Sequence, residues 1–342
     1  AEHHFTEDAH VAGAAGDRTS ELRARVNRAV ALLSRGQLEE AERIFVAVLE
    51  EGERIGDDRA SAFALDNLAV VATWRHEYGE ALMLSERTLQ KRLRIGDRLS
   101  TAFILSNLAE IRGKVGLLDY AEHAVSFGRR LLGPGMPPTL SVRFSVHAAR
   151  LALLRGRSVD AQREVGKALT EQATADSGEL AGRAHRVAAR IALEDGDVTR
   201  AVSAIDRARE LATTDFALAE VVVLEVALAR AKGELDVALA DRAVSLARTT
   251  GEEEILREAH LLAAKVYAAS GDAERARAHI DQALAVRDAV ARTLGEDVRA
   301  AFLARRDVAA LEAEAAALLP RPARPSDLEL EAEGPRTQRS PV

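Results

Sequence analysis

The chain has 342 residues, is rich in alanine, leucine and arginine, and carries a net charge of −7 with no cysteine. The acidic balance argues against a general nucleic-acid binder, because such domains usually carry a basic excess that displaces counterions from phosphates. The lack of cysteine excludes disulfides, cysteine nucleophiles and thiolate zinc sites, and no apolar run reaches the roughly 18 residues of a membrane span. We therefore expect a cytoplasmic protein with no nucleic-acid and no membrane partner.

Residues 1–19 are predicted to form an N-terminal extension of mixed polar and small residues. His3, His4 and His10 lie there beside carboxylates, a combination that suits zinc or nickel. Adjacent histidines near a terminus, without a second fixed cluster, are a weak signal for a metal. We expect no metal and no cofactor.

A period near 40 residues organises the chain from residue 20 onward. Seven turn positions are separated by 40, 40, 40, 40, 37 and 38 residues, and six of the seven are glycine, which fits the left-handed backbone that ends a helix. Alanine follows each turn position by five residues, and a second small residue precedes it by seven. Small side chains on both sides of a turn let antiparallel helices approach closely, so the period predicts seven tight helical hairpins.

The three columns of this repeat are as follows. The turn positions are Gly36, His76, Gly116, Gly156, Gly196, Gly233 and Gly271. The alanines after them are Ala41, Ala81, Ala121, Ala161, Ala201, Ala238 and Ala276. The small residues before them are Ala29, Ala69, Ala109, Ala149, Ala189, Val226 and Ala264.

The second and third hairpins contain Asn67-Leu68-Ala69 and Asn107-Leu108-Ala109, followed by the turn position and then by alanine. This pattern resembles the tetratricopeptide repeat. The period is longer than the family's usual 34 or so residues, and the helix-closing proline is missing. The resemblance is thus to the long-helix variants found in bacterial multidomain signalling and regulatory proteins. It implies an all-α fold, a right-handed α-solenoid of about seven hairpins.

The C-terminal part departs from the repeat. Leu294-Gly295-Glu296-Asp297 predicts a helix start, and apolar residues continue to Leu319. We interpret this segment as one capping helix that completes an array of residues 20–319, because a repeat array exposes an apolar face at its ends. Residues 320–342 are rich in proline and charge, which predicts a disordered tail. Its run of alternating acidic and apolar residues, 327–333, is a candidate internal competitor for a basic groove.

The resemblance also places the first helix of each hairpin on the inside of the superhelix, with the positions ten, nine and six before the turn facing a bound peptide. The position nine before the turn is a ladder of Asn27, Asn67, Asn107 and His147. A side-chain amide both donates and accepts, so the ladder suits the backbone of an extended peptide. The alternative is that these residues only bridge neighbouring repeats. Three aromatic residues at or beside the same face would supply apolar pockets: Phe63, Phe103 and Trp74.

Arginines form a second candidate site, the arginine grid. Arg143 and Arg150 in the fourth repeat match Arg183 and Arg190 in the fifth at an offset of 40 residues, with Arg186 between the latter two. Planar guanidinium groups suit carboxylate and phosphate, which predicts an acidic or phosphorylated segment in the partner. The alternative is neutralisation by nearby acids of the chain itself, namely Glu110, Glu194 and Glu220.

No catalytic motif is present, since the sequence has no glycine-rich phosphate loop, no HExxH and no GxSxG. Glu252, Glu253 and Glu254 stand at a helix start, where acidic runs are usually solvated caps. We therefore expect no enzyme and no catalytic residue, but a protein- or peptide-binding module, a sensor or adaptor segment of a bacterial signalling or transcription-regulatory protein. Two alternatives are a self-associating assembly scaffold and the regulatory array of an enzyme whose catalytic domain lies outside this chain.

Overall fold

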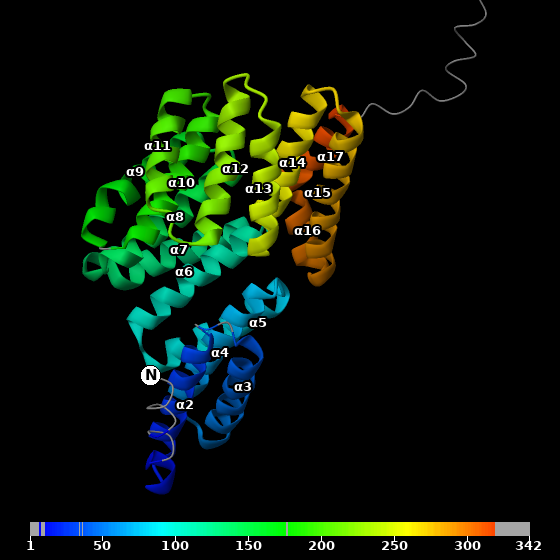
Figure 1. The fold of residues 1–342 in the computed structure, drawn as a ribbon. Coiled ribbons are helices and arrows are strands. Elements are labelled where there is room, and N and C mark those ends of the chain that lie inside the picture. The colour runs from blue at the N-terminus through cyan, green and yellow to red at the C-terminus, as the bar shows by residue number, and fades with distance from the viewer. Residues whose placement is uncertain (1–6, 8–10, 34, 36, 176, 319–342) are drawn as a thin grey trace, which may run out of the picture.

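A computed structural model describes residue 7 and residues 11–33, 35, 37–175 and 177–318. The part of the chain so described is all-α and contains no strand, and its helices form the seven predicted hairpins (Figure 1). The hairpins pair α2 (Arg18–Leu33) with α3 (Leu38–Ile55), α4 (Asp58–Trp74) with α5 (Tyr78–Ile95), α6 (Arg98–Lys114) with α7 (Leu118–Leu132), α8 (Pro138–Leu154) with α9 (Ser158–Ala175), α10 (Gly178–Glu194) with α11 (Val198–Glu210), α12 (Asp215–Ala231) with α13 (Val237–Thr250), and α14 (Glu253–Ala269) with α15 (Ala273–Thr293).

The turn positions adopt the predicted left-handed backbone wherever they are described; Gly36 lies outside the described residues. Gly116 has φ 82° and Gly271 has φ 86°. His76 has φ 63° and is the single non-glycine residue with positive φ in the described ranges. A side chain costs about 1–2 kcal/mol in this conformation, so His76 strains a turn that glycine would form freely.

The two small-residue columns line the interface within each hairpin, with one exception. The seven residues that precede the turns are all buried, and so are six of the seven alanines that follow them. Ala238 is exposed, and Ala240 is buried in its place. The reason is local, because Asp236 caps α13 by accepting a hydrogen bond from the backbone of Leu239, so that this helix starts two residues later than the others. The prediction for Ala238 was wrong by two residues.

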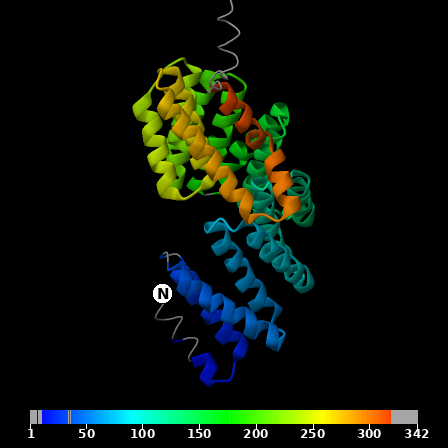
Figure 2. The ribbon, with the colours of Figure 1, turned by 90° about the vertical axis from the view of Figure 1, so that its right-hand side faces the viewer.

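Stacking of the first helices breaks once along the array. These helices pack on one another in consecutive repeats from α6 to α14 and between α2 and α4, whereas α4 and α6 hardly touch. The second repeat is joined to the third mainly through packing of α5 on α6. Helices α2–α5 therefore form an arm set at an angle to α6–α15, as both ribbon views show (Figures 1 and 2). We call α2–α5 the N-terminal arm.

The predicted single capping helix is two helices, α16 (Glu296–Ala304) and α17 (Arg306–Leu318). The chain bends at Arg305, whose φ of −59° and ψ of 130° leave the helical region. The side chain of Arg305 is fully buried and donates to the carbonyl oxygens of Gly113 and Lys114 at the end of α6. After the bend, α17 packs on α14 and α15, while Phe302 and Val308 join the core cluster that includes residues of α6. Residues 319–342, with the predicted tail, lie outside the described residues.

Candidate protein-interaction surface

One column of the first helices changes its chemistry along the array. The position thirteen residues before each turn is aromatic in the second and third repeats, basic in the fourth and fifth, and acidic in the sixth and seventh. Since it repeats at the same helical position, it faces the same side of each first helix. Its members in that order are Phe63, Phe103, Arg143, Arg183, Glu220 and Glu258.

The aromatic members of this column remain exposed. The side chains of Phe63 and Phe103 are 44% and 36% exposed, and Leu99, one turn before Phe103 on α6, is 46% exposed. The guanidinium of Arg92 lies 4.1 Å from the centre of the Phe63 ring, and that of Arg143 lies 5.9 Å from the centre of the Phe103 ring. Both rings are therefore held in place by a cation on one side while the remainder faces solvent.

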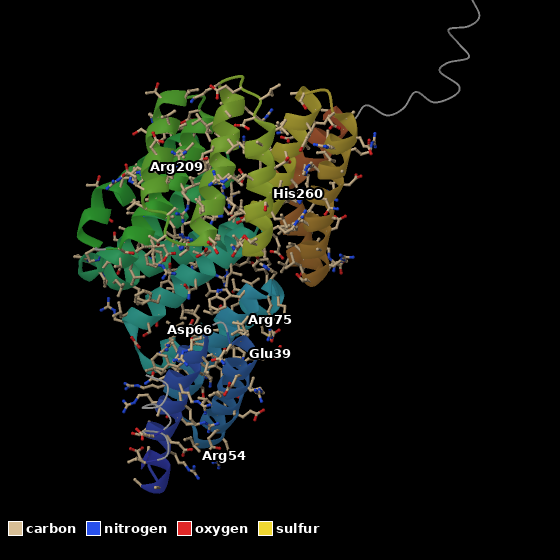
Figure 3. All side chains as sticks on the ribbon, viewed as in Figure 1. Glu39, Arg54, Asp66, Arg75, Arg209 and His260 are labelled. Carbon is tan, nitrogen blue, oxygen red and sulfur yellow. The ribbon has the colours of Figure 1, made fainter. Side chains whose placement is uncertain are left out.

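Asp66 lies on α4, where the N-terminal arm meets the rest of the array (Figure 3), and the charges of both Arg92 and Arg143 reach it. Within the described ranges, its carboxylate makes no hydrogen bond and no ion pair; Arg92 and Arg143 act on it only at a distance. Burial raises the pKa of Asp66 to about 6, against the opposing effect of these two positive charges. We define the open face as Phe63, Asp66, Leu99 and Phe103, with Arg92 and Arg143 behind them.

The four residues of the asparagine ladder differ in burial and in hydrogen bonding. Asn67 donates to the backbone oxygen of Phe63 at 2.8 Å, and Asn107 accepts from Arg143 at 2.7 Å. His147 is buried, its Nε2 lies 3.2 Å from the hydroxyl of Ser106, and burial lowers its pKa to about 3, which keeps the imidazole neutral. Asn27 on α2 is exposed. Whether these residues bind a partner stays a prediction; Asn67 is half-buried one turn from Phe63 on α4.

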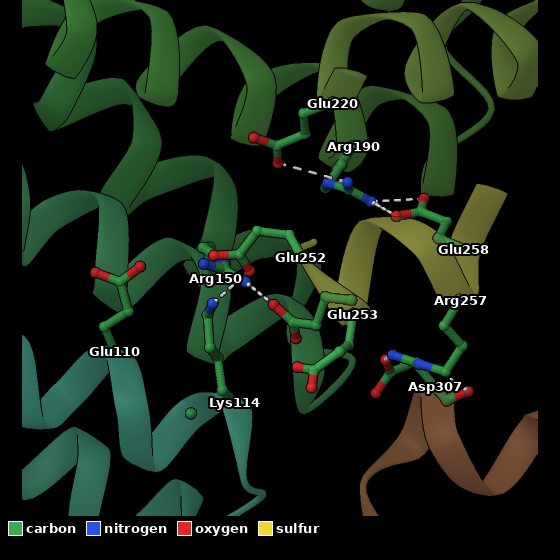
Figure 4. Close-up of polar contacts among 12 residues, drawn as sticks. Glu110, Lys114, Arg150, Arg190, Glu220, Glu252, Glu253, Arg257, Glu258 and Asp307 are labelled. Atoms are coloured by element: carbon green, nitrogen blue, oxygen red, sulfur yellow. Dashed lines mark hydrogen bonds and ion pairs between the residues drawn. The ribbon is translucent and has the colours of Figure 1, made fainter. Parts of the chain in front are cut away.

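The arginine grid is paired within the chain. Arg183 donates to Glu110 at 2.9 Å, and Arg150 donates to Glu254 at 3.0 Å. Arg186 and Arg190 both contact Glu220, at 2.6 and 3.5 Å. These partners are up to 104 residues apart in the sequence, so the basic and acidic repeats meet across the inside of the superhelix (Figure 4).

Arg190 contacts carboxylates from two different repeats. It donates to both oxygens of Glu258 at 2.6 Å, and the charges of Glu258 and Glu220 raise its pKa against the effect of burial. Arg143 is different, since it is bonded to Ser106 and Asn107 and, within the described residues, contacts no carboxylate. A partner acid would have to displace an internal carboxylate from Arg150, Arg183, Arg186 or Arg190, whereas Arg143 has no such competitor.

The acidic run at the start of α14 is not a solvated cap, contrary to expectation. Glu252 pairs with Lys114 at 2.8 Å, and Glu253 contacts both the imidazole of His76 at 3.0 Å and the hydroxyl of Tyr78 at 2.8 Å. Glu254 lies between Arg150 and Arg305, whose positive charges hold its pKa well below the ordinary value. These three carboxylates connect the seventh repeat to the second, third and fourth.

The remaining candidate residues have no shared site. Trp74 is 50% exposed at the end of α4, and His185 is partly buried on α10. His3, His4 and His10 lie outside the described residues. Where the structure does describe the chain, no three histidine or acidic side chains gather so as to hold a metal ion, and no helix has the length and apolarity needed to cross a membrane.

Sequence reasoning missed Asp66, His76 and the contacts of the acidic run. His76 had a visible signal, because it interrupts a column of glycines. Asp66 stands ten residues before a turn, as do Ser106 and Val146 in the next two repeats, and neither of these is charged, so this position carried no signal in the sequence. The contacts of α14 depend on how far the superhelix turns, which a repeat period does not specify.

Solved structures share this fold. A tetratricopeptide repeat protein from Parabacteroides merdae matches with a TM-score of 0.51 and 14% identity, over 82% of this chain and 98% of that one. A signal transduction ATPase with numerous domains, with a tetratricopeptide repeat sensor, from Pyrococcus horikoshii matches with a TM-score of 0.50 and 14% identity, over 96% of this chain. This chain spans 52% of that protein's length.

The comparisons thus confirm the resemblance at the level of fold: the chain is an all-α array of tetratricopeptide-like hairpins. No family model matches the sequence. No curated protein sequence matches it either.

Proposed function

We propose that this chain is a non-catalytic module that holds a segment of another protein on the open face. The observation that carries the proposal is the carboxylate of Asp66, which has no hydrogen-bond or ion-pair partner among the described residues and lies one turn from the exposed ring of Phe63 on α4. Its raised pKa means that folding disfavours its charge, so it costs stability at neutral pH. An unpaired titratable group beside exposed aromatic rings is typical of a binding site.

The chemistry of the open face defines the partner segment. The side chains of Phe63, Leu99 and Phe103 offer apolar contact, and Asp66 accepts hydrogen bonds from backbone or side-chain donors. Arg143, with no carboxylate of its own, favours an acidic or phosphorylated residue. We propose an extended segment that combines apolar side chains with at least one such acid, with Asn27 and Asn67 contacting its backbone.

The likeness to the Pyrococcus horikoshii protein supports a wider proposal. That protein is a signal transduction ATPase with a tetratricopeptide repeat sensor, and this chain matches 52% of its length. We propose that the present chain is likewise a sensor or adaptor segment of a bacterial signalling or regulatory protein.

Peptide selection tests the binding proposal. A phage-displayed library of random linear peptides is panned on the parent chain alone, and the peptides that bind are collected. We expect these peptides to be rich in leucine and acidic residues, and to bind the Phe63→Ala, Phe103→Ala double variant at least about tenfold more weakly in calorimetry. Tyr120→Ala removes a 62% exposed ring from α7 and is the matched control. Selected peptides that bind all three proteins equally would refute the proposal.

A further inference from the structure

A cluster of contacts joins the end of the array to the turns of the second and third repeats. We call it the clasp, and it consists of Glu252 and Glu253, α16 and Arg305 on one side, with His76, Tyr78 and residues 113–116 on the other. Its contacting residues are up to 192 residues apart in the sequence, as for Arg305 and Gly113. They lie at the ends of α4 and α6, the two neighbouring first helices that do not stack on one another.

The polar half of the clasp explains the strained turn at His76. The imidazole Nδ1 lies 3.0 Å from the carboxylate of Glu253, which also accepts from the hydroxyl of Tyr78. Glycine at this position would form the turn without strain but would have no side chain to reach Glu253. A conformation that costs stability and serves a long-range contact indicates a functional constraint.

The steric half of the clasp is the fit of α16 against the turn after α6. A β-carbon added to Gly116 would lie 2.3 Å from the carbonyl oxygen of Ala301, so this glycine is needed for close approach as well as for its positive φ. Arg305 then fastens the end of α16 to the carbonyl oxygens that end α6. Apolar contacts of Leu294 and Phe302 continue into the core of the N-terminal arm.

Because α4 and α6 hardly touch, the N-terminal arm is held by the packing of α5 on α6, by the clasp, and by the end of α15, where Val290 and Ala291 join the core cluster of the arm. Phe63 and Phe103 lie in the first halves of α4 and α6, towards the opposite ends of these helices from the clasp. A rotation about the α5–α6 contact would therefore change the separation of the two rings.

We propose that the clasp sets the angle of the N-terminal arm and thereby the width of the open face. Hinge closure about a few terminal residues of helices is a common way for a protein to couple two sites. The effect on binding rests on the proposed function above, whereas the movement of the arm does not. The movement can be measured in the protein alone.

The chain has no cysteine, so two introduced cysteines carry spin labels without background. Val46→Cys on α3 and Val159→Cys on α9 are exposed and lie outside the clasp. The distance distribution between the labels is measured by double electron–electron resonance in the parent chain, in Gly116→Ala and in Gly196→Ala. Both glycines have positive φ, but an added β-carbon at Gly196 meets nothing, so this variant is the control for backbone strain alone.

We expect Gly196→Ala to keep the narrow distribution of the parent and Gly116→Ala to give a shifted or at least twofold broader one. A second pair is kept for the case that Gly116→Ala does not fold. Glu253→Gln weakens the polar half of the clasp, and Glu274→Gln alters an acid in the first turn of α15 that is outside it. A widened distribution for Glu253→Gln, but not for Glu274→Gln, supports the proposal. The proposal is overturned if Gly116→Ala folds and gives the same distribution as Gly196→Ala. If Gly116→Ala does not fold, it is overturned when Glu253→Gln gives the same distribution as Glu274→Gln.

Discussion

The inner side of the array contains two regions built on the same helical positions with opposite outcomes. In the fifth to seventh repeats, Arg183, Glu220 and Glu258 occupy these positions, and each pairs with an oppositely charged side chain of another repeat. In the second and third repeats, phenylalanines occupy them and stay exposed, and the nearby carboxylate of Asp66 has no partner among the described residues. Ion pairs occupy the charged groups of one region, whereas the missing contact between α4 and α6 leaves the aromatic rings of the other exposed. Which part of a repeat array can bind a partner therefore depends on its side chains and on the turn of the superhelix.

The largest change in stability is expected from charge reversal at the arginine grid. Arg150→Glu with Arg190→Glu places two further carboxylates among Glu220, Glu254 and Glu258. Removing one partner from a fully buried pair costs about 3–5 kcal/mol, and these two pairs are only partly buried. We therefore expect urea unfolding to show a loss of about 2 kcal/mol or more for the two reversals together. Arg200→Glu, which changes an exposed arginine on α11, is the control and is expected to stay close to the parent chain. Intact stability of the double variant, with loss of binding of a selected peptide, would instead identify the grid as the site.

A smaller effect, of opposite sign, is expected at the open face. The pKa of Asp66 rises from 3.8 to about 6 on folding, so the native state binds the proton more tightly than the unfolded state. Stability therefore falls as the pH rises between these two values and stays lower above them. Asp66→Asn removes the charge, and we expect it to raise the melting temperature at pH 7 while leaving that at pH 4 nearly unchanged. A melting temperature lowered at pH 7 would show that the carboxylate has a stabilising partner.

Much of the fold was predictable from the sequence because it depends on local spacing. Turn glycines and small residues recur with each hairpin, and these alone define where two helices meet. The prediction for Ala238 was wrong because the side chain of Asp236 caps α13 and shifts the start of this helix. The bend at Arg305 was not predicted because it depends on carbonyl groups of α6, which lie far away in the sequence.

The candidate site was predictable only in its residue types. Helical register identified Phe63, Phe103, the asparagines and the arginines as facing one side. It did not indicate which of them would find partners, because that depends on the accumulated rotation of seven repeats. Small changes of angle in each repeat decide whether Glu254 reaches Arg150 and whether α4 stacks on α6.

The most direct test of the central claim is to map where a bound segment lies. A selected peptide carrying a photoreactive benzoylphenylalanine in place of one apolar residue is cross-linked to the parent chain, and the adducts are assigned by mass spectrometry. If the open face is the site, the adducts fall on α4 and α6, around Phe63 and Phe103. Adducts confined to α8 and α10, beside Arg150 and Arg190, would contradict the account and place the partner on the arginine grid.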